Sequence, residues 1–191
     1  VPKEEYLLND YAIRDEGNVT SKDEIESYVK PRPNRRILGW RFYLSLYNLS
    51  RKGKETGFNN WLRKIGESPV IFNPEMTDKT AQQVELHLYN KGYFNAAVED
   101  SVAYKRRKAN VYYKIDAGEP YTIRNIDYFF ADAGLSEYIM NDSIPSMLDE
   151  GMQFDVDDLQ SERIRIENIL RNEGYFNFNR DYVYYEVDSS L

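Results

Sequence analysis

The sequence predicts an α+β fold made of two tandem modules, each with the element order strand, helix, helix, strand, strand (β-α-α-β-β). The first observation is a repeat, because Gly92-Tyr93-Phe94-Asn95 recurs 82 positions later as Gly174-Tyr175-Phe176-Asn177. The second is an amphipathic helical pattern before each copy, with apolar residues three and four positions apart. The third is the tyrosine content of 17 residues, many of them in alternating runs typical of half-buried strands.

The first module is expected to span residues 1–118. Hydrophobic alternation predicts its strands, and capping residues and glycines predict where its helices begin and end. The expected elements are an opening strand (5–13), a short helix from the capping box Ser21–Glu24 to Pro31, a long helix from Thr77 as N-cap to Gly92, and a hairpin (97–104 and 111–115) joined by a polar turn at 105–110.

Residues 31–75 interrupt this pattern, and we interpret them as an insertion that the second module lacks. The run from Ile37 to Leu49 is apolar and has basic flanks. Residues 58–65 predict a short helix with Trp61, Leu62 and Ile65 on one side.

The second module is expected to span residues 119–191, after a Gly-Pro turn at 118–120 that we place at the boundary. Its expected elements are a strand (121–130), a short helix (135–141), a long helix (158–173) opened by a capping box of Asp157 and Gln160, and a strand (179–187). The first module continues with a hairpin partner at this point. We therefore expect the chain to end inside a module that lacks its last strand.

Charge is distributed unevenly along the chain. Residues 30–66 contain ten Lys or Arg and one Glu, a net +9 that leaves −16 for the rest of a chain whose total is −7. A basic stretch on an acidic protein favours a contact surface. The cations expected to form this partner surface are Arg32, Arg35, Arg36, Arg41, Arg51, Lys52, Lys54, Arg63 and Lys64.

No catalytic, cofactor or metal site is expected. His87 is the only histidine and there is no cysteine, so neither a triad nor a multi-histidine or thiolate metal site can be assembled. Carboxylates lie in predicted turns and on helix faces, where solvation or capping explains them. No apolar run reaches the roughly 18 residues needed to cross a bilayer. No signal peptide opens the sequence, as expected of a cytosolic protein or of a processed or trimmed one.

The repeated Gly-Tyr-Phe motif is interpreted as structural. A left-handed glycine ends each long helix, and the two aromatic residues then return to the core. The residues assigned to this role are Gly92, Tyr93, Phe94, Gly174, Tyr175 and Phe176.

The order and duplication of these motifs resemble the polypeptide-transport-associated (POTRA) domains that precede the membrane barrel in outer-membrane assembly factors of the BamA/TamA type. The resemblance covers nearly the whole chain, and the basic stretch 30–39 with its aromatic tail is similar to a version found in Bacteroidetes-type envelopes. The matching positions are Val84, Leu88, Gly92-Tyr93-Phe94 and 118–123 in the first copy, and Gly151, Phe154, Asp155, Leu159, Ile166, Leu170 and Gly174-Tyr175-Phe176 in the second.

The resemblance implies a non-enzymatic scaffold on the periplasmic side of the bacterial outer membrane, without cofactors, that serves outer-membrane protein assembly or translocation. The implied partners are unfolded outer-membrane protein segments, accessory envelope proteins and the chain's own C-terminal membrane barrel, which lies outside this sequence. Nucleic acid is not an expected partner, and membrane contact is expected only through the barrel.

Binding is expected at a sheet edge, where unpaired N–H and C=O groups can accept an extended client as another strand. In the family's arrangement the strand after the second helix lies at an edge. That strand corresponds to residues 98–104 in the first module and 179–187 in the second. The candidate client-binding residues are Val98, Asp100, Val102 and Tyr104.

The alternative function is binding of nucleic acid or of an anionic membrane surface by residues 30–66, where cations interleave with aromatic residues. In a competing interpretation the large apolar side chains form extra core and the charges stay solvated. We favour packing for the apolar residues and a partner surface for the arginines. The residues expected to pack are Trp40, Phe42, Leu44, Leu46 and Trp61.

Overall fold

The computed structural model describes residues 5–17, 21–50, 55–140 and 145–189. It combines one three-stranded sheet with helices, so the predicted α+β class is confirmed. The chain forms two compact units. The first unit holds residues 1–87 and 96–118, and the second holds residues 88–95 and 119–191.

The sheet of the first unit consists of β1 (Leu7–Asp15), β2 (Ala97–Lys105) and β3 (Lys108–Asp116) in the order β1-β3-β2. Strand β3 is central, parallel to β1 and antiparallel to β2. The predicted hairpin is present with a shorter turn, since only Arg106 and Arg107 connect the strands. Both have positive φ, 48° and 59°, as a two-residue hairpin turn of type I′ requires.

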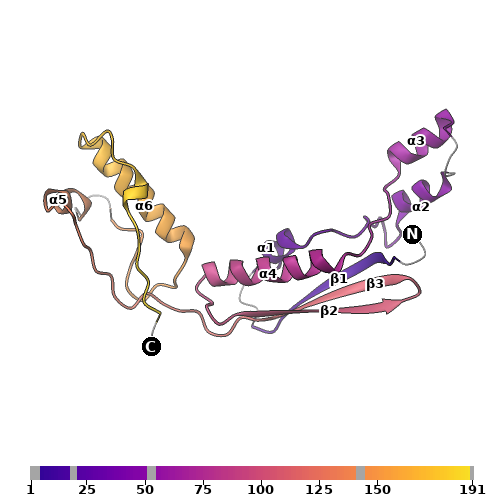
Figure 1. The fold of residues 1–191 in the computed structure, drawn as a ribbon, viewed down its shortest axis with the longest axis horizontal. Coiled ribbons are helices and arrows are strands. Elements are labelled where there is room, and N and C mark those ends of the chain that lie inside the picture. Colours follow the sequence, from indigo (N-terminus) through magenta and orange to yellow (C-terminus); the bar gives the residue numbers. More distant parts are fainter. Residues whose placement is uncertain (1–4, 18–20, 51–54, 141–144, 190–191) are drawn as a thin grey trace. The chain divides into compact units, whose positions relative to one another are not determined.

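Helices α1 (Lys22–Tyr28) and α4 (Pro74–Asn90) cover one face of this sheet (Figure 1). The predicted cap of α1 is present, because Ser21 Oγ accepts from the Glu24 N–H at 3.2 Å. Tight packing between the two layers excludes water from the apolar side chains that meet there. The buried residues of this core are Leu8, Val29, Ala81, Val111 and Tyr113.

The predicted start of the long helix was wrong by one turn. Helix α4 begins at Pro74, which suits the first helical position, and the Asn73 side chain accepts from the Glu75 N–H at 2.9 Å. Thr77 is buried inside the helix, and its hydroxyl donates to the Asn73 carbonyl. The N-cap is therefore Asn73, followed by Pro74, and not Thr77.

The insertion forms two short helices, α2 (Phe42–Leu49) and α3 (Gly57–Ile65), the second as predicted. They lie in contact, with Leu44 and Leu62 buried. A Cβ atom at Gly66 would lie 2.6 Å from the Tyr47 nitrogen, so only glycine permits this approach.

The second unit contains α5 (Gly134–Ile139), α6 (Val156–Asn172) and the 3₁₀ turn η1 (Arg180–Tyr182). Its core is built around Ile139, Ile166 and Leu170. The predicted capping box of Asp157 and Gln160 was wrong. The cap is Asp155, whose side chain accepts from the Asp157 N–H at 2.8 Å.

The strands predicted at 121–130 and 179–187 are not formed in the described part of the second unit. Thr122 makes one isolated bridge to Gln153, and residues 180–182 form η1. In the first unit both flanking strands pair with the central β3. No described segment of the second unit takes the place of β3, so neither run has a central strand to pair with, and backbone pairing is limited to residues 121–123 with 151–154. Apolar side chains of both runs still pack, with Phe130 and Val183 against the core.

Candidate functional site

The outer edge of β2 is the open edge of the sheet. Strand β2 pairs with β3 alone, and no other described segment pairs with its far side. Lys105 and Lys108 close the two-residue turn and face each other. Such a pair exchanges both hydrogen bonds, and hydrogen-bonded pairs alternate along an antiparallel ladder. Residues 97, 99, 101, 103 and 105 therefore bond to β3.

The alternate residues of β2 direct their backbone N–H and C=O groups to the open edge. This set consists of Val98, Asp100, Val102 and Tyr104, which are the four client-binding residues predicted from the sequence. Their role in binding stays a prediction. Val98 and Val102 pack against the core below α4. The Tyr104 ring lies 4.5 Å from that of Tyr6. Side-chain packing thus holds the strand in an extended form.

The outer edge of β1 is partly closed by the returning end of the insertion. The Leu8 N–H donates to the Val70 carbonyl and the Phe72 N–H to the Tyr6 carbonyl, both at 2.9 Å. The Asn9 carbonyl accepts from the guanidinium groups of Arg36 and Arg41. An extended segment would have to displace these donors and acceptors to pair with residues 6–9 at the start of β1.

Four of the predicted cations contact protein groups, and three of them link the insertion to residues outside it. Arg36 also forms an ion pair with Asp10 at 3.1 Å, and the Arg35 guanidinium lies over the Tyr43 ring at 5.3 Å. Arg32 donates to the Glu26 carbonyl. Burial and the neighbouring Arg36 lower the pKa of Arg41. Arg63 and Lys64 lie in the last turn of α3, whereas Arg51, Lys52 and Lys54 are outside the described residues.

The expectation that the large apolar residues of the insertion would form extra core was wrong for the aromatic ones. Leu44 is buried and Leu46 is half-buried. However, Trp40 and Trp61 are 64% and 52% exposed, and Phe42 is exposed as well. Two helices of eight and nine residues have one contact face each, so the side chains on their other faces find no cover within the described residues.

Both Gly-Tyr-Phe motifs end their helices in the same way. Gly92 and Gly174 have φ values of 89° and 97°. The Tyr93 N–H donates to the Leu88 carbonyl, and the Tyr175 N–H to the Leu170 carbonyl. The aromatic residues differ between the copies, because Tyr93 is buried and Phe94 half-buried, whereas Tyr175 and Phe176 are 38% and 77% exposed. The predicted core positions of Tyr175 and Phe176 are therefore not observed.

Sequence reasoning missed two ionic clusters in the second unit. Lys91 Nζ lies 2.8 Å from Asp155 and 2.9 Å from Asp157, and hydrogen bonds to these two carboxylates raise the pKa of Lys91. Glu162 and Arg165 form a buried pair at 2.6 Å within α6. For the second cluster, the sequence signal that could have found it is the spacing of three between Glu162 and Arg165, which places both residues on one helix face.

The buried pair is satisfied by its surroundings. Glu162 accepts from the Met147 N–H at 2.9 Å, and Arg165 donates to the Ile139 carbonyl. Burial alone would raise the pKa of Glu162, but the hydrogen bonds from Arg165 and from the Met147 N–H outweigh it and lower that pKa. The geometry fits a structural link between α6 and the segments beside it.

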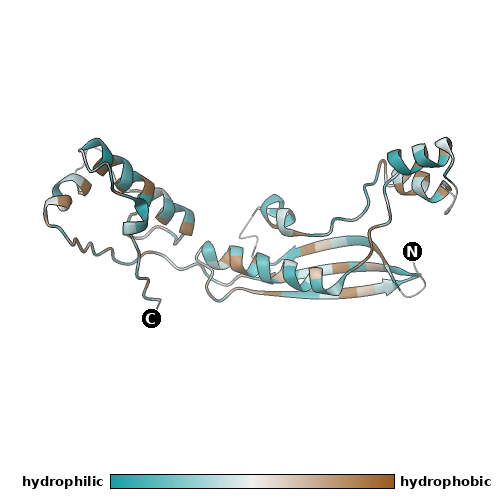
Figure 2. Ribbon diagram, turned by 45° about the horizontal axis from the view of Figure 1, so that its top comes forward, coloured by the Kyte–Doolittle hydropathy of each residue, from teal (hydrophilic) through white to brown (hydrophobic). Residues whose placement is uncertain are grey.

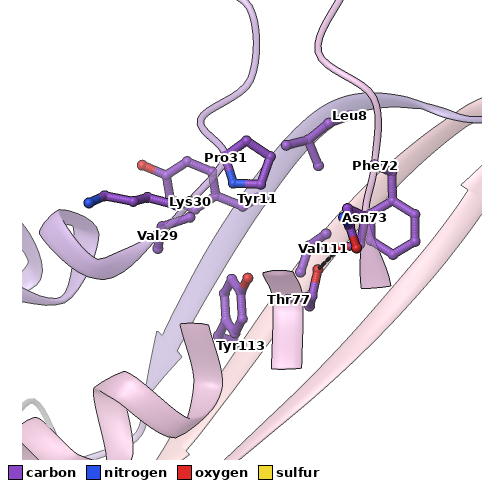
Figure 3. Close-up of a pocket in the computed structure, with 10 residues that line it drawn as sticks. All are labelled: Leu8, Tyr11, Val29, Lys30, Pro31, Phe72, Asn73, Thr77, Val111 and Tyr113. Atoms are coloured by element: carbon purple, nitrogen blue, oxygen red, sulfur yellow. Dashed lines mark hydrogen bonds between the residues drawn. The ribbon is translucent and has the colours of Figure 1, made fainter. Parts of the chain in front are cut away.

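One enclosed hollow lies between the sheet and the helical layer of the first unit (Figure 3). Its volume of about 10 Å³ is close to the room that one water molecule requires. Its polar groups include the hydroxyls of Tyr11, Tyr113 and Thr77. Among the described residues no cluster of three His, Cys, Asp or Glu could hold a metal ion. His87 Nδ1 lies 3.1 Å from the Tyr28 hydroxyl.

The first unit is a small three-stranded sheet with helices on one face and no described partner on the outer side of β2. A family model for POTRA domains, described as surface antigen variable number repeat, matches residues 12–118. The chain belongs to this family, which confirms the resemblance found in the sequence. Membership indicates a periplasmic protein-interaction module of outer-membrane assembly, of a family whose domains are scaffolds without enzymatic activity.

Solved structures of POTRA domains resemble the chain at low sequence identity. They include POTRA4 of Haemophilus influenzae BamA, with 13% identity, a TM-score of 0.36 and coverage of 61% of this chain and 95% of that one. POTRA3-5 of the same BamA has 14% identity and a TM-score of 0.30, and the match covers 93% of this chain and 90% of that one. POTRA1-2 of Omp85 from Anabaena has 13% identity and a TM-score of 0.33, with coverage of 92% of this chain and 84% of that one. No curated protein sequence matches significantly. In the described part of the chain, every helix is too short or too polar to cross a bilayer.

Proposed function

We propose that this chain is a non-enzymatic scaffold on the periplasmic side of the outer membrane, and that it captures extended client segments as an added strand on β2. The clients are unfolded outer-membrane protein segments, and accessory envelope proteins and a C-terminal membrane barrel are further partners. We also propose that residues 1–118 and 119–191 correspond to two POTRA modules.

The observation that carries this proposal is the difference between the two sheet edges. The edge at β2 offers alternating N–H and C=O groups from four residues, Val98, Asp100, Val102 and Tyr104, whereas the edge at β1 is partly covered by residues 70–72, Arg36 and Arg41. Main-chain bonds supply affinity with little choice of sequence, which suits a scaffold that meets many clients.

Two neighbouring proline substitutions test this edge. Val102→Pro removes an outward N–H, which edge strands tolerate, whereas Ser101→Pro removes an N–H that bonds to β3. The probe is a fluorescent peptide of about ten residues with alternating apolar and polar side chains, the length of a membrane-barrel strand. We expect V102P to keep its circular dichroism spectrum and to weaken peptide binding at least tenfold, and S101P to lose sheet structure.

Peptide variants control for side effects of proline. Methylation of the peptide nitrogens along one edge leaves the other edge able to pair, so binding should persist. Methylation along both edges should abolish it. Full binding by folded V102P, or by the doubly methylated peptide, would exclude strand addition at β2.

A further inference from the structure

The insertion exposes apolar side chains on both of its helices. On α3, Phe58, Trp61 and Ile65 are spaced by three and four residues and lie on one face, and Phe58 is 68% exposed. On α2, Phe42 and Leu49 lie seven residues apart on the face opposite the buried Leu44. Figure 2 shows hydrophobic residues on both helices. We call this set, together with Trp40, the hairpin patch.

The aromatic residues of the hairpin patch lie in pairs near the surface. The rings of Trp40 and Phe42 are 6.0 Å apart, and those of Phe58 and Trp61 are stacked at 5.9 Å. Exposed aromatic pairs present a large apolar area with few rotatable bonds, so little entropy is lost when they become covered. Scattered single apolar residues need no explanation, but a paired set of this size indicates a contact surface.

The two helices that carry the hairpin patch hold only positive charge. Neither α2 nor α3 contains an acidic residue, and Arg63 and Lys64 lie in the last turn of α3. Glu55 precedes α3, and the Glu67 carboxylate, which follows it, accepts from the Arg35 N–H. A partner that covers this patch is therefore expected to be apolar and to carry negative charge at its rim.

We propose that the hairpin patch lies on an anionic phospholipid surface. A short helix with aromatic residues on one face and cations beside them binds at the boundary between headgroups and acyl chains, where tryptophan is enriched. A nucleic-acid site would require a row of protein cations that contact successive phosphates. The guanidinium groups of Arg32, Arg36 and Arg41 instead donate to protein carbonyls. The proposal does not depend on client capture at β2.

The two tryptophans make a direct test possible, because the chain contains only Trp40 and Trp61 and both lie in the hairpin patch. We expect their fluorescence to shift to the blue when the full chain meets vesicles of phosphatidylglycerol and phosphatidylethanolamine. Vesicles of phosphatidylcholine alone should give a smaller shift, and added salt should reduce the shift on anionic vesicles without abolishing it.

The matched variants preserve both tryptophans. The double change Phe58→Ser and Ile65→Ser alters exposed positions and should lower the affinity for anionic vesicles at least tenfold. Phe129→Ser, at a residue 93% exposed in the second unit, should leave that affinity unchanged. No shift with anionic vesicles would overturn the proposal. A fluorescence shift with a single-stranded oligonucleotide but not with vesicles would also overturn it. A shift that depends on protein concentration alone would indicate self-association and would overturn it as well.

Discussion

The Leu8 N–H donates to the Val70 carbonyl at 2.9 Å, which joins the first strand to the end of the insertion. This bond lies on the side of β1 that faces away from β3. Together with the bond from Phe72 to Tyr6, it makes the two edges of one small sheet unequal. The insertion therefore contributes to the sheet itself, because its return pairs with the start of β1 and partly covers that edge, whereas no described segment pairs with the outer side of β2.

Arg36 and Arg41 should contribute to the stability of the covered edge. Replacing both by Ala leaves the Asn9 carbonyl without two charged donors, and we expect a loss of about 1–3 kcal/mol in the free energy of unfolding. Urea denaturation of the first unit measures this loss. Arg32→Ala is the control, since Arg32 donates to an exposed carbonyl and should cost no more than about 0.5 kcal/mol. Equal losses would show that the Asn9 contacts are unimportant.

The two repeated glycines should differ in their tolerance of alanine. The Cβ atom that Gly174→Ala adds has no atom within 4 Å, so this variant carries only the cost of a left-handed backbone, roughly 1–2 kcal/mol. Gly92→Ala carries the same cost and also places a Cβ atom 2.6 Å from the Phe154 carbonyl oxygen. We expect G92A to destabilise the second unit at least twice as much in chemical denaturation. Similar losses would mean that the chain around Phe154 moves away easily.

The Lys91 cluster predicts a dependence of stability on alkaline pH. The pKa of Lys91 is raised above its usual 10.5 by its hydrogen bonds to Asp155 and Asp157. The stabilisation is therefore complete below about pH 10 and is lost as the pH rises through the raised folded-state pKa. Lys91→Met should cost about 1–2 kcal/mol at neutral pH and flatten the alkaline decline.

Arg180→Ala provides the control for Lys91. Arg180 lies 3.9 Å from Glu167 and is half exposed, so solvent screening should keep its effect within about 0.5 kcal/mol. Thermal unfolding of the second unit between neutral and alkaline pH compares the two variants. An unchanged pH profile in K91M would contradict the assigned role of the cluster.

The Glu162–Arg165 pair should be far more sensitive to loss of one partner than to loss of both. Glu162→Ala removes the carboxylate that pairs with the buried Arg165 charge, at an expected cost of about 3–5 kcal/mol. The double change Glu162→Leu and Arg165→Met removes both charges and should cost much less. A double-mutant cycle measured by denaturation tests this non-additivity, and additive losses would contradict it.

Acid titration gives an independent test of the same pair. Because the pKa of Glu162 is lowered from its usual 4.5, its contribution is complete above about pH 5 and is lost as the pH falls through the folded-state pKa. The wild-type chain should lose stability in this range, and the Leu/Met double variant should lose less. The measurement is the denaturation midpoint as a function of pH.

Local signals predicted most of the first unit. The Ser21 cap, the glycine stop at Gly92 and the alternation of residues 97–115 depend on neighbours within a few positions, and the structure reproduces them. The predicted start of α4 was wrong because two nearby cap signals competed, Thr77 and Asn73-Pro74, and the helix begins at the second. In the second unit, residues 121–130 alternate between half-buried and exposed, whereas in 179–187 only Val183 and Tyr185 are half-buried. A strand also requires a partner strand, and alternation carries no information about one.

The candidate site was predictable on one side only. Alternation along β2 identifies which residues share a face, and the two-residue turn then assigns their backbone groups to the open edge. The cover of β1 by Val70 joins positions more than sixty residues apart, which no local pattern reveals. Exposure of Trp40 and Trp61 was likewise missed, because apolar composition predicts burial only when enough surface is available to cover the side chains.

The parallel pairing of β1 with β3 has a kinetic consequence. Asn9 and Asn110, which share a hydrogen bond across these strands, are separated by 101 positions. The hairpin of β2 and β3 needs only local closure, so it can assemble early, whereas the N-terminal strand must wait until almost the entire first unit has been synthesised. Closure entropy grows with the logarithm of loop length, so the 31–75 segment adds only about 0.5 kcal/mol to that search.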